Sequence, residues 1–118
     1  MEQTDINLKT YVIYILLMVI VFFSSTAFGQ MKAIHFNAEW NEANKVEWFE
    51  KLSDVKKEKM DIGEGDCAKK YKIAIVPTIL IIKDGEEVAR FQADLSFKMI
   101  ATRKEIQEEI DEILMSDF

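Results

Sequence analysis

Two residues in the chain belong to the types that most often carry nucleophilic or acid–base chemistry. They are Cys67 and His35, and the chain has no other cysteine or histidine. One cysteine cannot form an intramolecular disulfide, and one cysteine with one histidine offers too few ligands for a zinc site. His35 lies between Ile34 and Phe36 in an apolar segment, which favours a hydrogen-bonded structural role. Cys67 is expected to be a small buried residue; a monothiol role, such as glutathionylation or an intermolecular disulfide, is the alternative.

The charged residues do not predict a metal or a nucleic-acid site. Glu64 and Asp66 stand beside glycines, but their spacing lacks the number of ligands that a calcium loop needs. The net charge is −6, and the lysine pairs at 56–57 and 69–70 are diluted by acidic residues. Binding to phosphates requires a basic face, so nucleic acid is excluded as a partner. We therefore expect no metal, no cofactor and no nucleic acid.

The elements that must position these residues alternate between strand and helix. In chain order we expect a strand at 32–36, a helix capped by Asn41 or Asn44, a strand at 59–62, a short helix at 67–72, strands at 78–82 and 86–92, and a final helix. The signals are strongest near the end of the chain. Asp84-Gly85 is a hairpin turn, and Thr102 with Glu105 forms a capping box. The order β-α-β-α-β-β-α predicts one α/β domain over residues 31–118.

Residues 1–30 are set apart by composition. Residues 11–23 are apolar without a charge, and the uncharged stretch continues to Phe28. A cleaved signal peptide fits, with the cut before Gln30, and so does a retained transmembrane anchor formed by residues 11–28. Both alternatives direct the chain to a membrane. The domain is then expected to be anchored outside the cytosol, or secreted or periplasmic after cleavage.

Several short motifs, taken together, resemble the thioredoxin family. Ala38-Glu39-Trp40 precedes the first helix, Val76-Pro77-Thr78 precedes the central strand, and the Asp84-Gly85 hairpin follows it. The resemblance covers residues 31–114 and lacks the β-α unit that begins many thioredoxins. It implies a three-layer sandwich with a mixed central sheet, here preceded by one N-terminal hydrophobic helix.

The resemblance also assigns positions to the redox site. Thioredoxins typically carry Trp-Cys-Gly-Pro-Cys-Lys, and the two cysteine positions here are Asn41 and Asn44, within Asn41-Glu42-Ala43-Asn44. His35 stands at the family's buried-acid position, and Pro77 corresponds to the proline that faces the active site. An amide cannot form the mixed disulfide on which exchange depends. We therefore expect no catalytic residue in this segment.

The function that follows is a redox-inactive protein-binding module or a subunit of a membrane-associated assembly. Thioredoxins bind extended polypeptide beside the proline loop, partly through main-chain hydrogen bonds, and this mode does not require cysteines. The expected surface consists of Trp40, Val76, Pro77 and Thr78, with Asn41 and Asn44 as its polar rim. The alternative is a thiol–disulfide oxidoreductase that works through Cys67 or through thiols of a partner.

Overall fold

The computed structural model describes residues 10–13 and 30–116 of the chain. Residues 10–13 are helical, and no helix within the described ranges is long and apolar enough to cross a membrane. The predicted hydrophobic helix and the cleavage site before Gln30 lie almost entirely outside these ranges. They therefore stay predictions.

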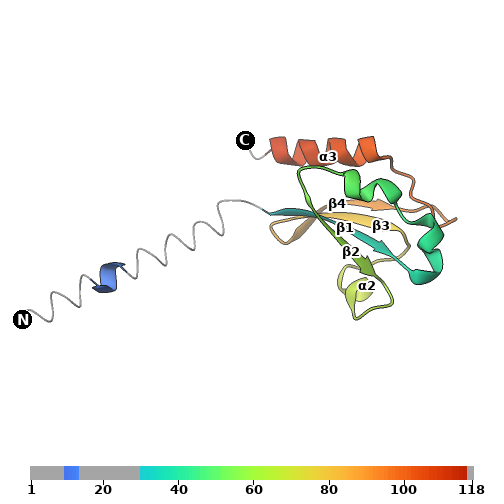
Figure 1. Cartoon of the computed structure of the whole chain (residues 1–118), viewed down its shortest axis with the longest axis horizontal. Helices are drawn as coiled ribbons and strands as arrows, with labels where there is room; N and C mark the ends of the chain where they lie inside the picture. Colours follow the sequence, from blue (N-terminus) through green and yellow to red (C-terminus); the bar gives the residue numbers. More distant parts are fainter. Residues whose placement is uncertain (1–9, 14–29, 117–118) are drawn as a thin grey trace, which may run out of the picture.

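A mixed four-stranded sheet forms the middle of the domain (Figure 1). Its strands are β1 (Met31–Asn37), β2 (Lys56–Asp61), β3 (Thr78–Lys83) and β4 (Glu86–Gln92). They lie in the order β2-β1-β3-β4, with β1 parallel to β2 and β3 antiparallel to both of its neighbours. The apolar run of β3 is explained by its central place, because such a strand is covered on both faces.

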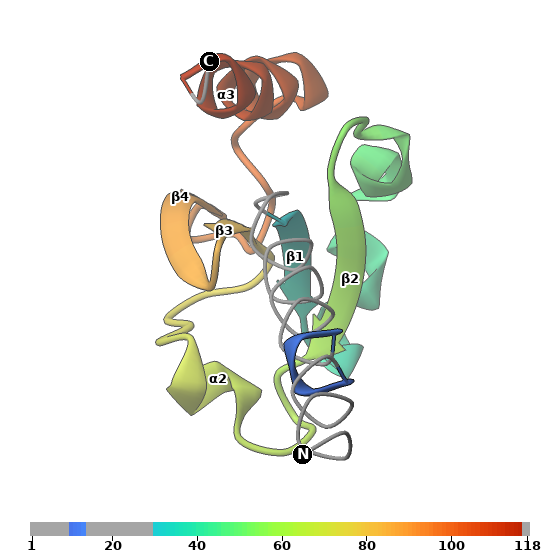
Figure 2. The same ribbon diagram turned by 90° about the vertical axis from the view of Figure 1, so that its left-hand side faces the viewer.

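Helical segments cover both faces of this sheet, which confirms the thioredoxin-like α/β architecture. They are η1 (Glu39–Asn44), η2 (Glu47–Lys51), α2 (Cys67–Lys70) and α3 (Arg103–Met115). Helices α3 and α2 lie on opposite sides of the sheet (Figure 2). Side chains of β1 alternate between the two cores: Ala33 packs with Phe49 and Ile106 on the α3 side, and Phe36 packs near Tyr71 on the α2 side.

The helix expected after β1 is replaced by two short 3-10 helices, so the prediction of one α-helix is wrong. Neither Asn41 nor Asn44 is an N-cap; these positions belong to Ala38 and Val46, without side-chain capping. The break coincides with a contact to β1. The backbone N–H of Val46 donates to the ring of His35 at 3.2 Å, and the chain leaves the helical conformation there. A continuous helix would instead have directed this N–H to a carbonyl one turn earlier.

Local signals near the end of the chain are confirmed. Asp84 and Gly85 both have positive φ, as a two-residue hairpin turn of type I′ requires, and Lys83 pairs with Glu86 across it. The capping box of α3 is complete, since the hydroxyl of Thr102 accepts from the Glu105 N–H. Two earlier elements differ from expectation. β2 begins three residues before the predicted strand, and α2 is shorter than the predicted helix.

Candidate functional site

The site is built around a pair of buried asparagines at the end of β1. Asn37 is the last residue of the strand, and Asn41 follows within η1; their exposed fractions are 7% and 4%. The Asn37 amide donates to the Asn41 carbonyl at 3.1 Å, and the Asn41 amide donates to the Asn37 side-chain oxygen at 3.1 Å. These reciprocal bonds fold the chain back on itself directly after the strand.

Asn41 also joins two further segments to this pair. Its amide nitrogen donates to the Phe97 carbonyl at 3.2 Å, across a sequence separation of 56 residues. Its oxygen accepts from the amide of Asn44 at 2.9 Å. Both amide hydrogens and the oxygen of Asn41 are therefore engaged, which is what a buried amide requires. Asn41 was expected at an exposed rim; it is buried instead, while Asn44 remains partly exposed.

Two members of this network, Asn37 and Phe97, were not identified as site residues from the sequence. A signal for Asn37 was present, because residues 37, 41 and 44 are asparagines spaced by four and three, the intervals at which side chains share one side of a helical turn. No comparable signal exists for Phe97. Its contact with Asn41 depends on how the sheet brings the two ends of the domain together.

An exposed aromatic pair lies over the buried amides. The indole of Trp40 is 67% exposed and packs edge-to-face against the ring of Phe97, with centroids 5.0 Å apart. Phe97 has a φ of +64° in a tight turn. Asp94 holds this turn by accepting from Ser96 and from the Lys98 N–H, and the hydrogen bond from the Ser96 side chain is the main reason that the pKa of Asp94 is lowered.

The proline loop has the cis peptide bond typical of the family, but its side chains are buried. The Val76–Pro77 peptide bond is cis, and Val76, Pro77 and Thr78 are all buried. The loop runs directly into β3, where Thr78 pairs with β1 on one side and with β4 on the other. In addition, the Ala93 N–H donates to the Pro77 carbonyl at 3.0 Å. The side chains of these three residues are therefore not open to solvent, and the partner-binding role expected of them stays a prediction.

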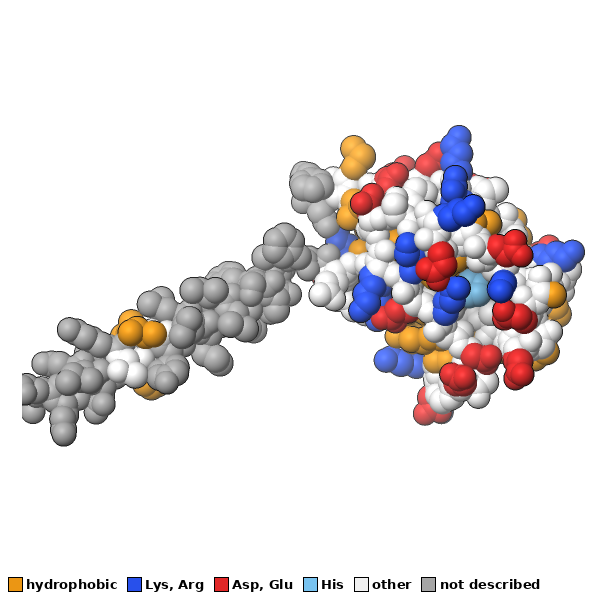
Figure 3. Space-filling model, viewed as in Figure 1, with side chains coloured by type: hydrophobic (Ala, Val, Ile, Leu, Met, Phe, Trp, Pro, Cys, Tyr) orange, Lys and Arg blue, Asp and Glu red, His pale blue; other side chains and the backbone are white. Residues whose placement is uncertain are grey.

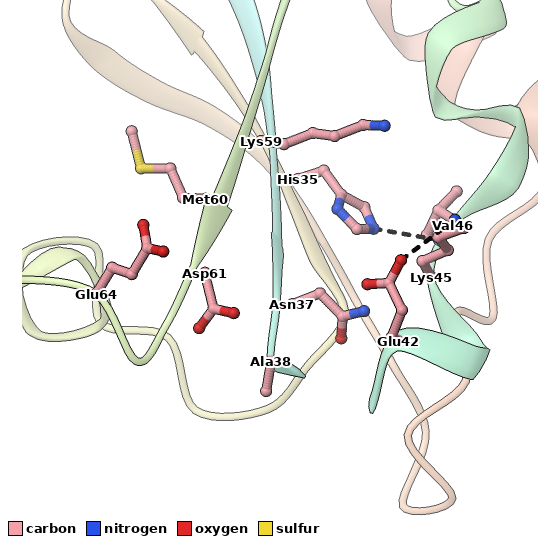
Figure 4. A pocket seen from close by; sticks show the side chains of 10 residues that line it. All are labelled: His35, Asn37, Ala38, Glu42, Lys45, Val46, Lys59, Met60, Asp61 and Glu64. Carbon is pink, nitrogen blue, oxygen red and sulfur yellow. Dashed lines mark hydrogen bonds and ion pairs between the residues drawn. The ribbon is translucent and has the colours of Figure 1, made fainter. Parts of the chain in front are cut away.

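His35 is a buried and hydrogen-bonded residue. It is 5% exposed, and its Nε2 accepts from the Val46 N–H (Figure 4). Its ring also packs against that of Phe49, with centroids 5.3 Å apart. Burial, followed by the charge of Lys59, lowers the pKa of His35 to about 4. The imidazole is consequently neutral at physiological pH.

Cys67 lies on the other face of the sheet from His35, at the start of α2. It is partly buried within the second core, and its Sγ is 3.3 Å from the Asp61 carbonyl and 3.5 Å from the Glu64 carbonyl. It has no place in the asparagine network. Within the described residues, no cluster of histidine, cysteine and carboxylate side chains could hold a metal ion.

Comparison with known proteins relates the fold to thioredoxins. No protein-family model and no curated protein matches the chain. Among solved structures, Fasciola hepatica thioredoxin is 31% identical, with 71% of this chain and 81% of that chain covered at a TM-score of 0.52. The reduced thioredoxin of Schistosoma mansoni is 25% identical, with 70% and 78% covered and a TM-score of 0.56. Thioredoxin-2 of the malaria parasite shares 16% identity, with 71% and 84% covered and a TM-score of 0.55.

We expect Asn41→Ala to lower the free energy of unfolding by about 2–3 kcal/mol, because it leaves buried partners without hydrogen bonds. Asn44→Ala is the matched control. It removes one bond from a partly exposed residue and should cost about 0.5–1 kcal/mol. Denaturant unfolding of the two variants measures the difference. Equal losses would show that the buried amide does not hold this site together.

The depressed pKa of His35 predicts a specific loss of stability in acid. The unfolded chain takes up a proton on this ring near its ordinary pKa of 6.5, and the folded chain only near 4. The contribution of the neutral His35 ring to stability is complete above the higher pKa and is lost as the pH falls from the higher pKa to the lower. The free energy of unfolding falls by at most about 3 kcal/mol over this range. His35→Gln keeps an acceptor for Val46 but cannot titrate. Denaturant unfolding at several pH values should therefore show a smaller acid loss in this variant; parallel profiles would contradict the assignment.

Proposed function

This chain belongs to the thioredoxin family, and we propose that its domain is a redox-inactive module that binds a protein partner through Trp40. Both positions of the family's dithiol are asparagines. In the structure their amides hydrogen-bond to one another and to the neighbouring chain. They hold the site in shape, and they supply no nucleophile for thiol–disulfide exchange.

The observation that carries this proposal is the exposed pair of Trp40 and Phe97. Large aromatic rings dominate the energetics of protein interfaces, and a ring that is already held in place loses little entropy on binding. Trp40 is steadied by Phe97, whose own carbonyl is bound by Asn41. The loop that carries Phe97 also exposes Leu95 and Ile100, at 93% and 68%. We call these four exposed side chains, on η1 and on the loop after β4, the Trp40 surface.

The partner is proposed to contact this surface rather than to insert beside Pro77. Strand addition next to the proline loop would use the main chain of Val76, which makes no hydrogen bond within the described residues. However, Val76 is only 2% exposed. The side chain of Trp40, by contrast, is exposed to solvent and can be reached by a partner without any rearrangement. An extended polypeptide remains a suitable partner if it crosses the exposed rings.

We further propose that residues 11–28 direct the chain to a membrane, as a cleaved signal or as a retained anchor, with the domain outside the cytosol. Only Gly29 and Gln30 separate this stretch from β1. Trp40 comes three residues after the end of β1, and β1 is about 20 Å long at the usual rise per strand residue. A retained anchor would thus leave the Trp40 surface facing away from the lipid. The malaria parasite thioredoxin, described as a component of protein secretion machinery, is a precedent for this fold in an assembly.

The binding role predicts that Trp40→Ala weakens partner capture at least about tenfold, as expected of an aromatic hot spot. Its free energy of unfolding should change by about 1 kcal/mol or less. Met115→Ala, which truncates an exposed apolar residue on α3, is the control. The measurement is quantitative mass spectrometry of proteins that co-purify with each tagged full-length chain from native membranes in mild detergent. Equal capture by all three chains would remove Trp40 from the interface.

The absence of redox function predicts that the wild-type chain does not accelerate reduction of insulin disulfides by dithiothreitol. Its single thiol has no second thiol in the chain to resolve a mixed disulfide. Cys67→Ser should therefore behave as the wild type does. Turnover that is present in the wild type and lost in Cys67→Ser would instead establish the oxidoreductase alternative.

A further inference from the structure

A pocket of about 340 Å³ lies at the carboxyl ends of the parallel strands β1 and β2 (Figure 4). In open α/β sheets, ligands bind outside the carboxyl ends of the strands. Six of the side chains that line this pocket can carry a charge: His35, Glu42, Lys45, Lys59, Asp61 and Glu64. The histidine is visible from outside in the space-filling view, ringed by basic and acidic side chains (Figure 3).

The imidazole of His35 presents a fixed hydrogen-bond donor to this pocket. Its Nε2 accepts from the Val46 N–H, so the neutral ring carries its proton on Nδ1. Nδ1 has no hydrogen-bond partner among the described residues. Every fully buried side-chain nitrogen or oxygen among them does have one, so Nδ1 is not fully buried. Nδ1 is therefore reached from the pocket, on a side chain that is itself 5% exposed. A ligand that displaces water from this N–H must supply an acceptor in its place.

Positive charge stands beside this donor. Lys59 is the neighbour of His35 across the β1–β2 pair, and its ammonium is 3.1 Å from Glu50. Lys45 is held by Glu42 at 3.2 Å on the opposite wall. A carboxylate between His35 and Lys59 would accept from both, and hydrogen bonds between ionised groups are stronger than those between neutral groups.

Negative charge lies at the other end of the pocket, where β2 stops. One Asp61 oxygen accepts from the Gly63 N–H at 2.7 Å. Neither Asp61 nor Glu64 forms an ion pair within the described part of the chain. These carboxylates suit an ammonium group. A plain anion would meet their repulsion, and a plain cation would offer no acceptor to the His35 N–H.

We propose that this pocket binds a small zwitterion, with its carboxylate between His35 and Lys59 and its ammonium beside Asp61 and Glu64. Amino acids are the chemical class that this lining fits. The site uses none of the residues of the Trp40 surface, so it stands whether or not that surface binds a protein.

The test uses His35 as its own reporter, since the chain has a single histidine. The proton–carbon correlation signal of its ring is followed in the full-length chain at neutral pH during titration with β-alanine. Two matched probes each lack one charged group: propanoate has no ammonium and propylamine has no carboxylate. We expect a saturable shift with β-alanine and binding about tenfold or more weaker for either probe, since each loses charged hydrogen bonds.

Variants identify the two ends of the site. Lys59→Met and Glu64→Gln should each weaken β-alanine about tenfold, whereas Lys104→Met, on the exposed surface of α3, should leave its affinity unchanged. Unfolding midpoints confirm that each variant is folded. A ring signal that does not respond to β-alanine would overturn the proposal. So would equal affinities for the three solutes, or unchanged affinity in both pocket variants.

Discussion

The hydrogen bonds of the Asn41 side chain hold together the segments that carry Trp40 and Phe97. This amide links the end of β1, the turn of η1 and the distant loop at Phe97. Thioredoxins typically have a cysteine at this position. Here the position is buried, and burial of an amide is tolerated only when its donors and acceptor are all satisfied. The conformation of η1 and the place of Phe97 follow from meeting that requirement.

A second buried polar group, the ring of His35, forms a hydrogen bond with the backbone that follows η1. Because His35 accepts from the Val46 N–H, the helical backbone of η1 does not continue, and η2 begins at the residue after Val46. The same hydrogen bond fixes which ring nitrogen carries the proton. One contact therefore sets both the backbone course between the two 3-10 helices and the donor that His35 presents at the end of the β1–β2 pair.

The two polar groups explain how a thioredoxin-like fold can persist without sulfur at its redox segment. Asparagines at both cysteine positions remove the nucleophile, yet they form bonds that a thiol pair would not. The resulting site has an exposed aromatic pair above a satisfied polar layer, and a charged pocket beside it. Both features suit binding, and neither needs a covalent step.

The sequence alone determined the order of the elements, the Asp84-Gly85 hairpin, the capping box at Thr102 and the loss of the dithiol. Each of these depends on residue types within a few positions of one another, so local chemistry is enough. Only the tertiary structure decided that Asn41 is buried, that His35 interrupts the first helix and that Phe97 lies against Trp40. The hydrogen bonds behind the first two outcomes join residues 56 and 11 positions apart, and no local pattern encodes which distant group will satisfy a buried polar atom.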